Sequence, residues 1–273
     1  VILEEEAHVN SVIDPAGGSY YVENLTKEIA EKSWELFQFI EQNGGYLVNL
    51  QNGKLQEMVE ETVKKRRADF NKRKSVLVGT NMYANPKETI QSDLLSNKPN
   101  NVNLSGQTDI QFLEKAKPFK EFRLASNFEK LRLNFEEFCK SKNEKSKMLL
   151  ATMGQLKDFK ARADFSRAFF EPVGFEILYP NGFDTTEQLF DTIGENNPEV
   201  VVICSTDDKY PEIVPEITAK IKQKDISPVV VLAGYPKDKI EEYKRYGIDE
   251  FIYLGADVFE INSRILKAIG VEL

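Results

Sequence analysis

Between residue 147 and the last residue, short apolar runs alternate with longer segments of helical periodicity. The apolar runs are Met148–Met153, Phe175–Tyr179, Val200–Cys204, Val229–Ala233 and Phe251–Leu254. The segments expected as helices span about 156–172, 184–195, 210–223, 236–246 and 257–269. Strands that alternate with helices pair in parallel through crossovers, and they lack apolar–polar alternation because both of their faces are buried. The sequence therefore predicts a three-layer α/β domain over residues 146–273.

The loops that follow the strands are where function is expected in such a domain. A flavodoxin-like order is the natural choice for five parallel strands, and its ligands bind at the carboxyl ends of the strands. Those loops contain residues 154–158, 180–182, 205–209, 234–236 and 255–257.

Residues 1–90 have another organisation. A sharp turn is expected at Asp14–Ser19, where a proline precedes two glycines. An amphipathic helix follows from about Leu25 to the glycine pair Gly44–Gly45, and a second helix spans about Lys54–Lys74. The run Ser75–Thr80 predicts a short buried strand. With only this strand and two helices, the region cannot close a sheet, so we expect it to expose apolar surface.

Residues 91–145 are interpreted as a linker, because Asn, Lys, Ser and Pro dominate its first part. Its second part, Phe119–Cys139, carries phenylalanines interleaved with charged residues. Two interpretations stay open for this segment. It forms a helix that covers a core with its aromatic rings, or it lies against another chain, since Phe and Arg are enriched at interfaces.

The composition excludes several classes of function. With 36 Lys and Arg against 44 Asp and Glu, the net charge is −8, which disfavours nucleic acid as a partner. No apolar run approaches the ~18 residues of a membrane span. One histidine, His8, and two cysteines, Cys139 and Cys204, are too few for a zinc or iron–sulfur site. We expect no metal, a structural or surface role for His8, and a reducing cytoplasm. Because Val1 is not Met, we expect the chain to begin within a longer protein.

Two stretches, the string from Val12 to Glu23 and residues 147–273, together resemble one family, the methylmalonyl-CoA mutases. The string from Val12 to Glu23, which contains Asp-Pro-Ala-Gly-Gly-Ser-Tyr, is similar to the end of their TIM-type substrate barrel. Residues 147–273, with Met153-Gly154-Gln155 after the first strand, look like their cobalamin-binding domain. The resemblance implies the end of a barrel over 1–90, a linker over 91–145 and a flavodoxin-fold, cobalamin-binding-like domain over 146–273.

The chain departs from this family at the positions that hold the cofactor. The catalytic members carry Asp-x-His-x-x-Gly in the first loop, where the histidine ligates cobalt; here Leu156, Asp158 and Ala161 take these three places. The third-strand motif Ser-x-Leu is represented by Ser205 and Asp207. The glycine pair after the fourth strand is reduced to Ala233 and Gly234, which adds a methyl group where the nucleotide tail would pass.

This pattern of loss resembles the small subunit of the heterodimeric bacterial mutases. The resemblance implies a non-catalytic chain without its own cofactor, paired with a large catalytic subunit that holds adenosylcobalamin and interconverts methylmalonyl-CoA and succinyl-CoA. No catalytic, cofactor-binding or metal residue is then expected here. Residual cobalamin binding without a histidine ligand stays open. The alternative is a regulatory module in which Asp207 or Asp208 accepts a phosphoryl group or holds Mg²⁺.

More ordinary roles are also expected for these side chains. Asp207 or Asp208 would cap the following helix. Asp158 would form a surface ion pair with Lys157, Lys160 or Arg162. The adjacent Phe169 and Phe170 are expected in the core.

Overall fold

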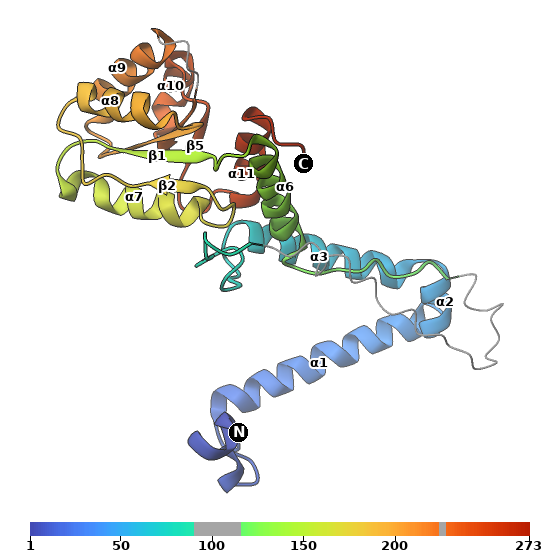
Figure 1. The fold of residues 1–273 in the computed structure, drawn as a ribbon. Coiled ribbons are helices and arrows are strands. Elements are labelled where there is room, and N and C mark those ends of the chain that lie inside the picture. The colour runs from blue at the N-terminus through green and yellow to red at the C-terminus, as the bar shows by residue number, and fades with distance from the viewer. Residues whose placement is uncertain (90–115, 224–227) are drawn as a thin grey trace. The chain divides into compact units, whose positions relative to one another are not determined.

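The computed structural model describes residues 1–89, 116–223 and 228–273 (Figure 1). They form two compact units. The described part of the first unit comprises residues 1–62 and 116–120, and that of the second comprises residues 63–89 and 121–273 apart from the gap. No helix in the described part of the chain combines the length and the apolar character that a bilayer crossing requires.

The first unit is helical. A π-helical turn, Ile2–Glu6, and a 3-10 turn, Val9–Ser11, precede α1 (Tyr20–Gln42) and α2 (Gly45–Gln51); α3 (Lys54–Asn71) continues into the second unit. The expected helix end at the glycine pair is confirmed, because α1 ends at Gln42 and Gly44 adopts a φ of +97°. Buried Asn49 ties α2 to α1 by donating hydrogen bonds to the carbonyls of Ile40, Asn43 and Gly45. The sequence analysis did not predict α2.

The first unit exposes much apolar surface, as expected. Helix α1 has no buried residue. Most of its large apolar side chains are exposed, with exposed fractions between 40% and 89%. They include Trp34, which is 59% exposed and stacks on Phe37 with 5.2 Å between the ring centroids. Exposed apolar area of this extent is typical of a surface that another chain or domain covers.

The strand predicted at Ser75–Thr80 is wrong. In the structure the segment forms turns, with Val78 making a single bridge to Met82. Val78 is 73% exposed rather than buried. A strand needs a neighbour to satisfy its backbone groups, and none of the strands in the described residues pairs with this segment. Its backbone is held instead by the side chain of Asn81, which is fully buried.

The second unit contains one five-stranded parallel sheet in the order β2-β1-β3-β4-β5. This order confirms the predicted flavodoxin-like α/β domain. The strands are β1 (Lys147–Thr152), β2 (Glu176–Leu178), β3 (Val200–Cys204), β4 (Val229–Ala233) and β5 (Glu250–Ile252). The helices between and after them are α7 (Leu156–Phe170), α8 (Thr186–Asn196), α9 (Tyr210–Gln223), the 3-10 turn Lys237–Lys239 with α10 (Ile240–Tyr246), and α11 (Val258–Ala268).

The sheet lies between two apolar layers (Figure 1). Side chains of α7 and α11 pack on one face, and those of α8, α9 and α10 pack on the other. Phe169 and Phe170 are 1% and 0% exposed, which confirms their predicted place in the core. Strands β1, β3 and β4 are buried on both faces, so their sequences show no alternation.

Helix α6 (Ser126–Lys142) belongs to this same unit, although the sequence placed it in the linker over 91–145. It lies beside α11, and Phe128, Leu131 and Phe135 enter the core layer of α7 and α11. Of the two interpretations of Phe119–Cys139, the structure therefore supports a helix that covers a core with its aromatic rings. The first part of the predicted linker, residues 91–115, lies outside the described residues.

Candidate functional site at the carboxyl edge of the sheet

The predicted site residues lie in the loops and first helical turns after β1, β3 and β4. The structure brings these loops together at the carboxyl edge of the sheet, because parallel strands all end on the same side. Three side chains that the sequence analysis did not single out for the site connect them: Arg162, Lys209 and Tyr210.

The loop after β1 is organised as a helix start. Gly154 adopts a φ of +95°, and Gln155 is the N-cap of α7. Asp158 completes a capping box, since its Oδ2 accepts the Gln155 N–H at 3.0 Å. Leu156, the first residue of α7, is 59% exposed. The carboxylate of the predicted site residue Asp158 therefore serves as part of the N-terminal cap of α7.

Asp158 is also bound to the loop after β3. Its Oδ2 lies 2.6 Å from the Lys209 Nζ, so the expected pairing with Lys157, Lys160 or Arg162 is wrong. Lys160 lies two positions further along α7 and pairs with Asp164 at 2.9 Å. The hydrogen bond from Lys209, followed by that from the Gln155 backbone, lowers the pKa of Asp158 below its ordinary value of 3.8.

A buried tyrosine joins the ends of β3 and β4. The Tyr210 hydroxyl donates to the Ala233 carbonyl at 2.6 Å and accepts the Ser205 N–H at 3.2 Å. Ser205 is itself buried and donates its hydroxyl to the Met153 carbonyl at 3.0 Å, at the end of β1. Burial raises the pKa of Tyr210, so the phenol stays protonated and acts as a fixed crosslink.

Arg162 covers the neighbouring part of the edge. Its Nη1 donates to the Ala233 carbonyl, and its Nη2 lies 2.9 Å from Asp207 Oδ1. The guanidinium also lies 5.3 Å from the centroid of the Tyr210 ring. Asp207 is thus engaged with Arg162 rather than capping α9, and Asp208 is exposed with no cap contact among the described residues.

The titratable groups around the edge offer no assembled metal or nucleophile site. No group of three or more His, Cys, Asp or Glu side chains in the described residues could hold a metal ion. Cys204 lies at the end of β3, fully buried against Ser166, and burial raises the pKa of its thiol to about 12. A thiol of this kind remains protonated and inert near neutral pH. His8 is exposed in the other unit.

We expect the Lys209→Met variant to lose a pH-dependent part of its stability. A carboxyl whose pKa is depressed in the folded state stabilises that state above its ordinary pKa, and this contribution fades as the pH falls. The stability difference between the wild type and the variant should therefore be largest above pH 5 and shrink below pH 3.8. Denaturant unfolding across this range measures it.

Lys157→Met is the matched control, because Lys157 makes the smallest contribution to the lowered pKa of Asp158. It should show little pH-dependent difference from the wild type. An equal pH dependence in both variants would mean that Asp158 senses general positive charge rather than the specific contact with Lys209.

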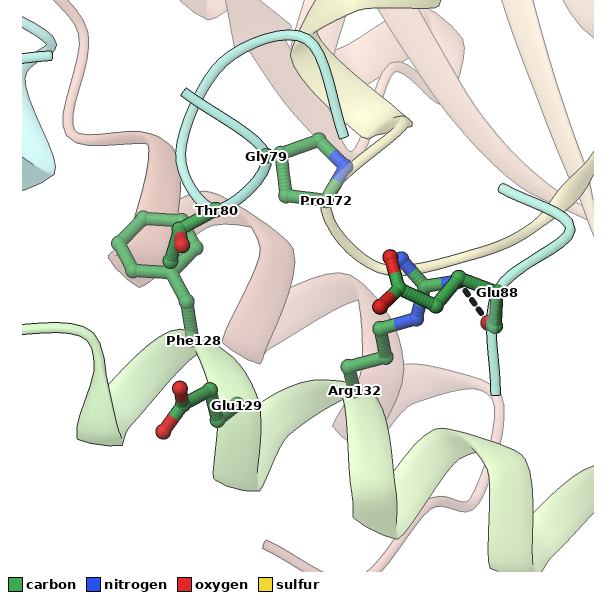
Figure 2. Close-up of a pocket in the computed structure, with 7 residues that line it drawn as sticks. All are labelled: Gly79, Thr80, Glu88, Phe128, Glu129, Arg132 and Pro172. Atoms are coloured by element: carbon green, nitrogen blue, oxygen red, sulfur yellow. Dashed lines mark hydrogen bonds between the residues drawn. The ribbon is translucent and has the colours of Figure 1, made fainter. Parts of the chain in front are cut away.

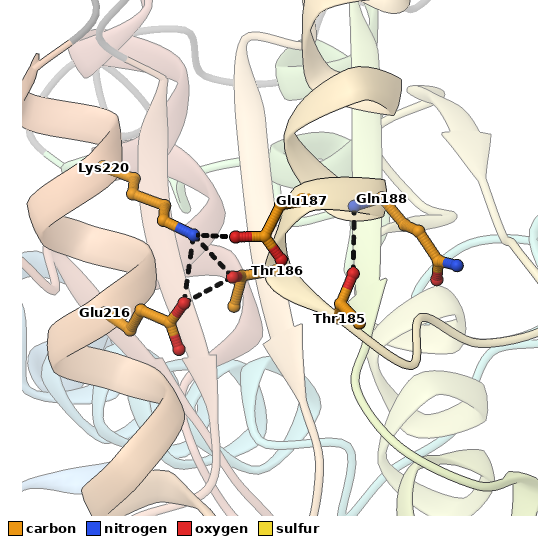
Figure 3. A network of polar contacts seen from close by, with 6 residues as sticks. All are labelled: Thr185, Thr186, Glu187, Gln188, Glu216 and Lys220. Atoms are coloured by element: carbon orange, nitrogen blue, oxygen red, sulfur yellow. Dashed lines mark hydrogen bonds and ion pairs between the residues drawn. The ribbon is translucent and has the colours of Figure 1, made fainter.

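A polar pocket and a hydrogen-bond network lie away from the carboxyl edge. Figure 2 shows a pocket of about 180 Å³ between α6, the Gly79–Thr80 turn and Pro172, where Arg132 donates to the backbone carbonyl of Glu88. Figure 3 shows Lys220 of α9 donating to Thr186, Glu187 and Glu216 at 2.7, 2.8 and 3.0 Å. The first fastens the segment before the undescribed residues to α6, and the second joins α8 to α9. Both are structural connections.

Sequence reasoning located the edge but missed its connecting side chains. Arg162, Lys209 and Tyr210 stand within a few positions of the predicted residues, yet each finds its partner on a different loop. The one available signal was the juxtaposition of opposite charges, with a carboxylate and a cation in each of two loops that meet at one edge.

Fold and site together define a doubly wound α/β domain of the kind that binds ligands at its carboxyl edge, here with that edge crosslinked by its own side chains. The sequence model of the methylmalonyl-CoA mutases matches residues 1–155, more than half of the chain. The chain belongs to the methylmalonyl-CoA mutase family.

Small subunits of methylmalonyl-CoA mutases agree with this assignment. A methylmalonyl-CoA mutase small subunit from Porphyromonas gingivalis is 30% identical over 271 residues, which cover 99% of this chain and 41% of that protein. The small subunit from Streptomyces virginiae is 26% identical, over 99% of this chain and 40% of that one. The chain thus spans about two fifths of the length of these relatives. A solved cobalamin-binding protein from Desulfitobacterium hafniense is 21% identical with a TM-score of 0.38, covering 53% of this chain and 72% of that one.

Proposed function

We propose that this chain is the carboxyl-terminal part of the non-catalytic small subunit of a heterodimeric methylmalonyl-CoA mutase. Its partner is a large catalytic subunit that holds adenosylcobalamin, and the holoenzyme interconverts methylmalonyl-CoA and succinyl-CoA. In this proposal residues 1–90 complete a TIM-type barrel, and the protein works in the cytoplasm. The similarity to small subunits over 99% of the chain supports the assignment.

The state of Asp158 is the observation that carries the proposal. Cobalt would need a neutral imidazole nitrogen at this position, with a carboxylate nearby to hold its tautomer. The position instead carries a carboxylate that accepts the Gln155 N–H at 3.0 Å and lies 2.6 Å from Lys209 Nζ. Leu156, at the place of the orienting carboxylate, is exposed and has no polar side-chain atom. These residues do not fit a cobalt ligand set, and we assign no catalytic step to them.

The structure lends the regulatory alternative less support. A phosphoryl acceptor or Mg²⁺ site requires carboxylates that converge on one ion. Asp207 lies 2.9 Å from Arg162, and Asp158 is bound to Lys209, so each carboxylate already has a cation. If Asp207 nevertheless accepts phosphate, acetyl phosphate with Mg²⁺ should label the protein, and Asp207→Asn should abolish the label.

Cobalamin titration tests the proposal. We expect the intact polypeptide that contains this chain to cause no change in the visible spectrum of hydroxocobalamin and to elute free of it in gel filtration. A family member with the complete Asp-x-His-x-x-Gly motif, run in parallel, should bind one equivalent. Stoichiometric binding by the polypeptide of this chain would refute the proposal.

Co-purification tests the partner. An affinity tag on the intact polypeptide should recover a second chain in a one-to-one ratio, with the length of a full mutase and the histidine motif that this chain lacks. Mass spectrometry identifies it. Recovery of the tagged chain alone, from native-source extract that contains the large subunit, would contradict the heterodimer.

A further inference from the structure

The side chain of Arg162 fills a definite place at the carboxyl edge. Contacts of three kinds hold its planar guanidinium there. They are a hydrogen bond to the Ala233 carbonyl, an ion pair with Asp207 at 2.9 Å and a face contact with the Tyr210 ring at 5.3 Å. The Arg162 side chain is 27% exposed and that of Asp207 is 65% exposed. The cation is therefore partly buried in the edge, and its counter-ion lies on the solvent side.

The guanidinium lies directly over Gly234. A Cβ built on Gly234 would clash with Arg162 Nη1, so the guanidinium would have to leave its place and give up its contacts there. The next nearest side chain, Tyr210, is 3.4 Å away and leaves room. Arg162 is therefore what closes the space above this glycine.

An apolar pocket of about 290 Å³ adjoins the same place. Arg162 is the one cation among its lining residues, and the rest of the wall is largely aromatic or aliphatic, including Phe165, Tyr253 and Leu254. Tyr235 and Tyr253 form one side of it, with 4.2 Å between their ring centroids. A wall of this character suits a flat apolar or heteroaromatic ring.

We propose that Arg162 is the chain's own occupant of the ligand crevice, with Asp207 as its counter-ion, and that it alone keeps a planar heteroaromatic ligand of the benzimidazole class from lying over Gly234. The guanidinium supplies what such a ring would supply: a flat face for Tyr210 and an N–H donor for Ala233. This inference rests on the proposed function, because it explains how the domain remains folded without a cofactor.

A double-mutant cycle tests whether Arg162 covers Gly234. The φ of +156° at Gly234 makes Gly234→Ala unfavourable in any background, and that part cancels in the cycle. In the intact polypeptide, Gly234→Ala should raise the hydrogen-exchange rate of the peptide around β4 at least tenfold. In the Arg162→Ala background the same change should raise it at least fivefold less. Equal factors in the two backgrounds would overturn the proposal.

Ligand binding tests whether Arg162 excludes the ring. The probe is 5,6-dimethylbenzimidazole, followed by saturation-transfer NMR. Arg162→Ala should bind it at least tenfold more tightly than the wild type does. Arg167→Ala is the matched control: Arg167 lies on the same helix and pairs with Glu171 at 3.3 Å on the surface, so its removal should leave binding unchanged. No gain for Arg162→Ala, or an equal gain for Arg167→Ala, would overturn the proposal.

Arg162→Gln repeats both measurements if Arg162→Ala folds poorly, because the shorter amide does not reach Gly234. The outcomes also separate this inference from the proposed function. Stoichiometric cobalamin binding by the wild type would refute the proposed function. A wild type that binds no cobalamin, combined with additive effects of the Arg162 and Gly234 substitutions, would refute only the role of Arg162.

Discussion

Phe135→Ala should destabilise the second unit by about 3–5 kcal/mol, the range found when a large aromatic side chain is removed from a packed core. Phe135 lies on α6, is 2% exposed and packs against Phe175 with 4.5 Å between the ring centroids. Its removal would leave a cavity between α6 and the turn before β2. The measurement is denaturant unfolding of the intact polypeptide, read from hydrogen exchange of peptides from β1 and β3.

Glu137→Ala is the matched control for Phe135→Ala. Glu137 lies two positions further along α6, exposed to solvent, and alanine is the better helix former. The stability should therefore change by less than about 0.5 kcal/mol. If Phe135→Ala were equally mild, α6 would be an appendage that the sheet does not need, and the interpretation of 91–145 as a linker up to the first strand would be restored.

Asn81→Ala should release the segment from residue 75 to residue 84 from the end of α3. Asn81 is 0% exposed, and its amide donates to the carbonyls of Phe70 and Ser75 at 2.9 and 2.8 Å. Its Oδ1 accepts the Leu77 N–H at 2.9 Å. Each buried group left without its partner costs about 1–3 kcal/mol. Ser75 and Leu77 are exposed, so water can replace part of their bonds, and we expect a total near the lower end of the sum, about 3–4 kcal/mol.

Limited proteolysis measures this release. A loss of about 3–4 kcal/mol in the local opening equilibrium corresponds to a cleavage rate at Leu77 about 100- to 1,000-fold faster, at roughly tenfold per 1.4 kcal/mol. Asn85→Ala is the control. Asn85 is exposed, and within the described residues its side chain accepts one hydrogen bond, from the nearby Lys87 N–H at 3.0 Å. Unchanged cleavage in Asn81→Ala would show that another contact holds the segment.

The sequence predicted the second unit well and the segment at 75–80 poorly, for one physical reason. A strand that is buried on both faces, such as Val200–Cys204, needs a continuous apolar run, and such a run is readable without knowing its neighbours. The run at Ser75–Thr80 has the same character. Whether an apolar run becomes a strand depends on a partner for its backbone, and the described residues provide none there.

For the candidate site, too, the sequence predicted one part and missed another. The place of the site follows from local patterns, because parallel strands bring the loops after β1, β3 and β4 to one edge whatever their side chains are. Which side chains meet at that edge is a question of distance between residues far apart in the chain. Asp158 and Lys209 are 51 positions apart, and Arg162 and the Ala233 carbonyl are 71 apart.

The sequence by itself determined the parallel α/β architecture, the order in which its elements follow one another, the ends of most helices, and the absence of histidine from the α/β domain. These properties depend on residue type and local spacing. Only the tertiary structure decided that α6 completes the core, that Asn81 replaces a strand partner, and that Arg162 and Lys209 close the edge. Each of these rests on contacts across the fold, whose free energies depend on burial and geometry that no local pattern encodes.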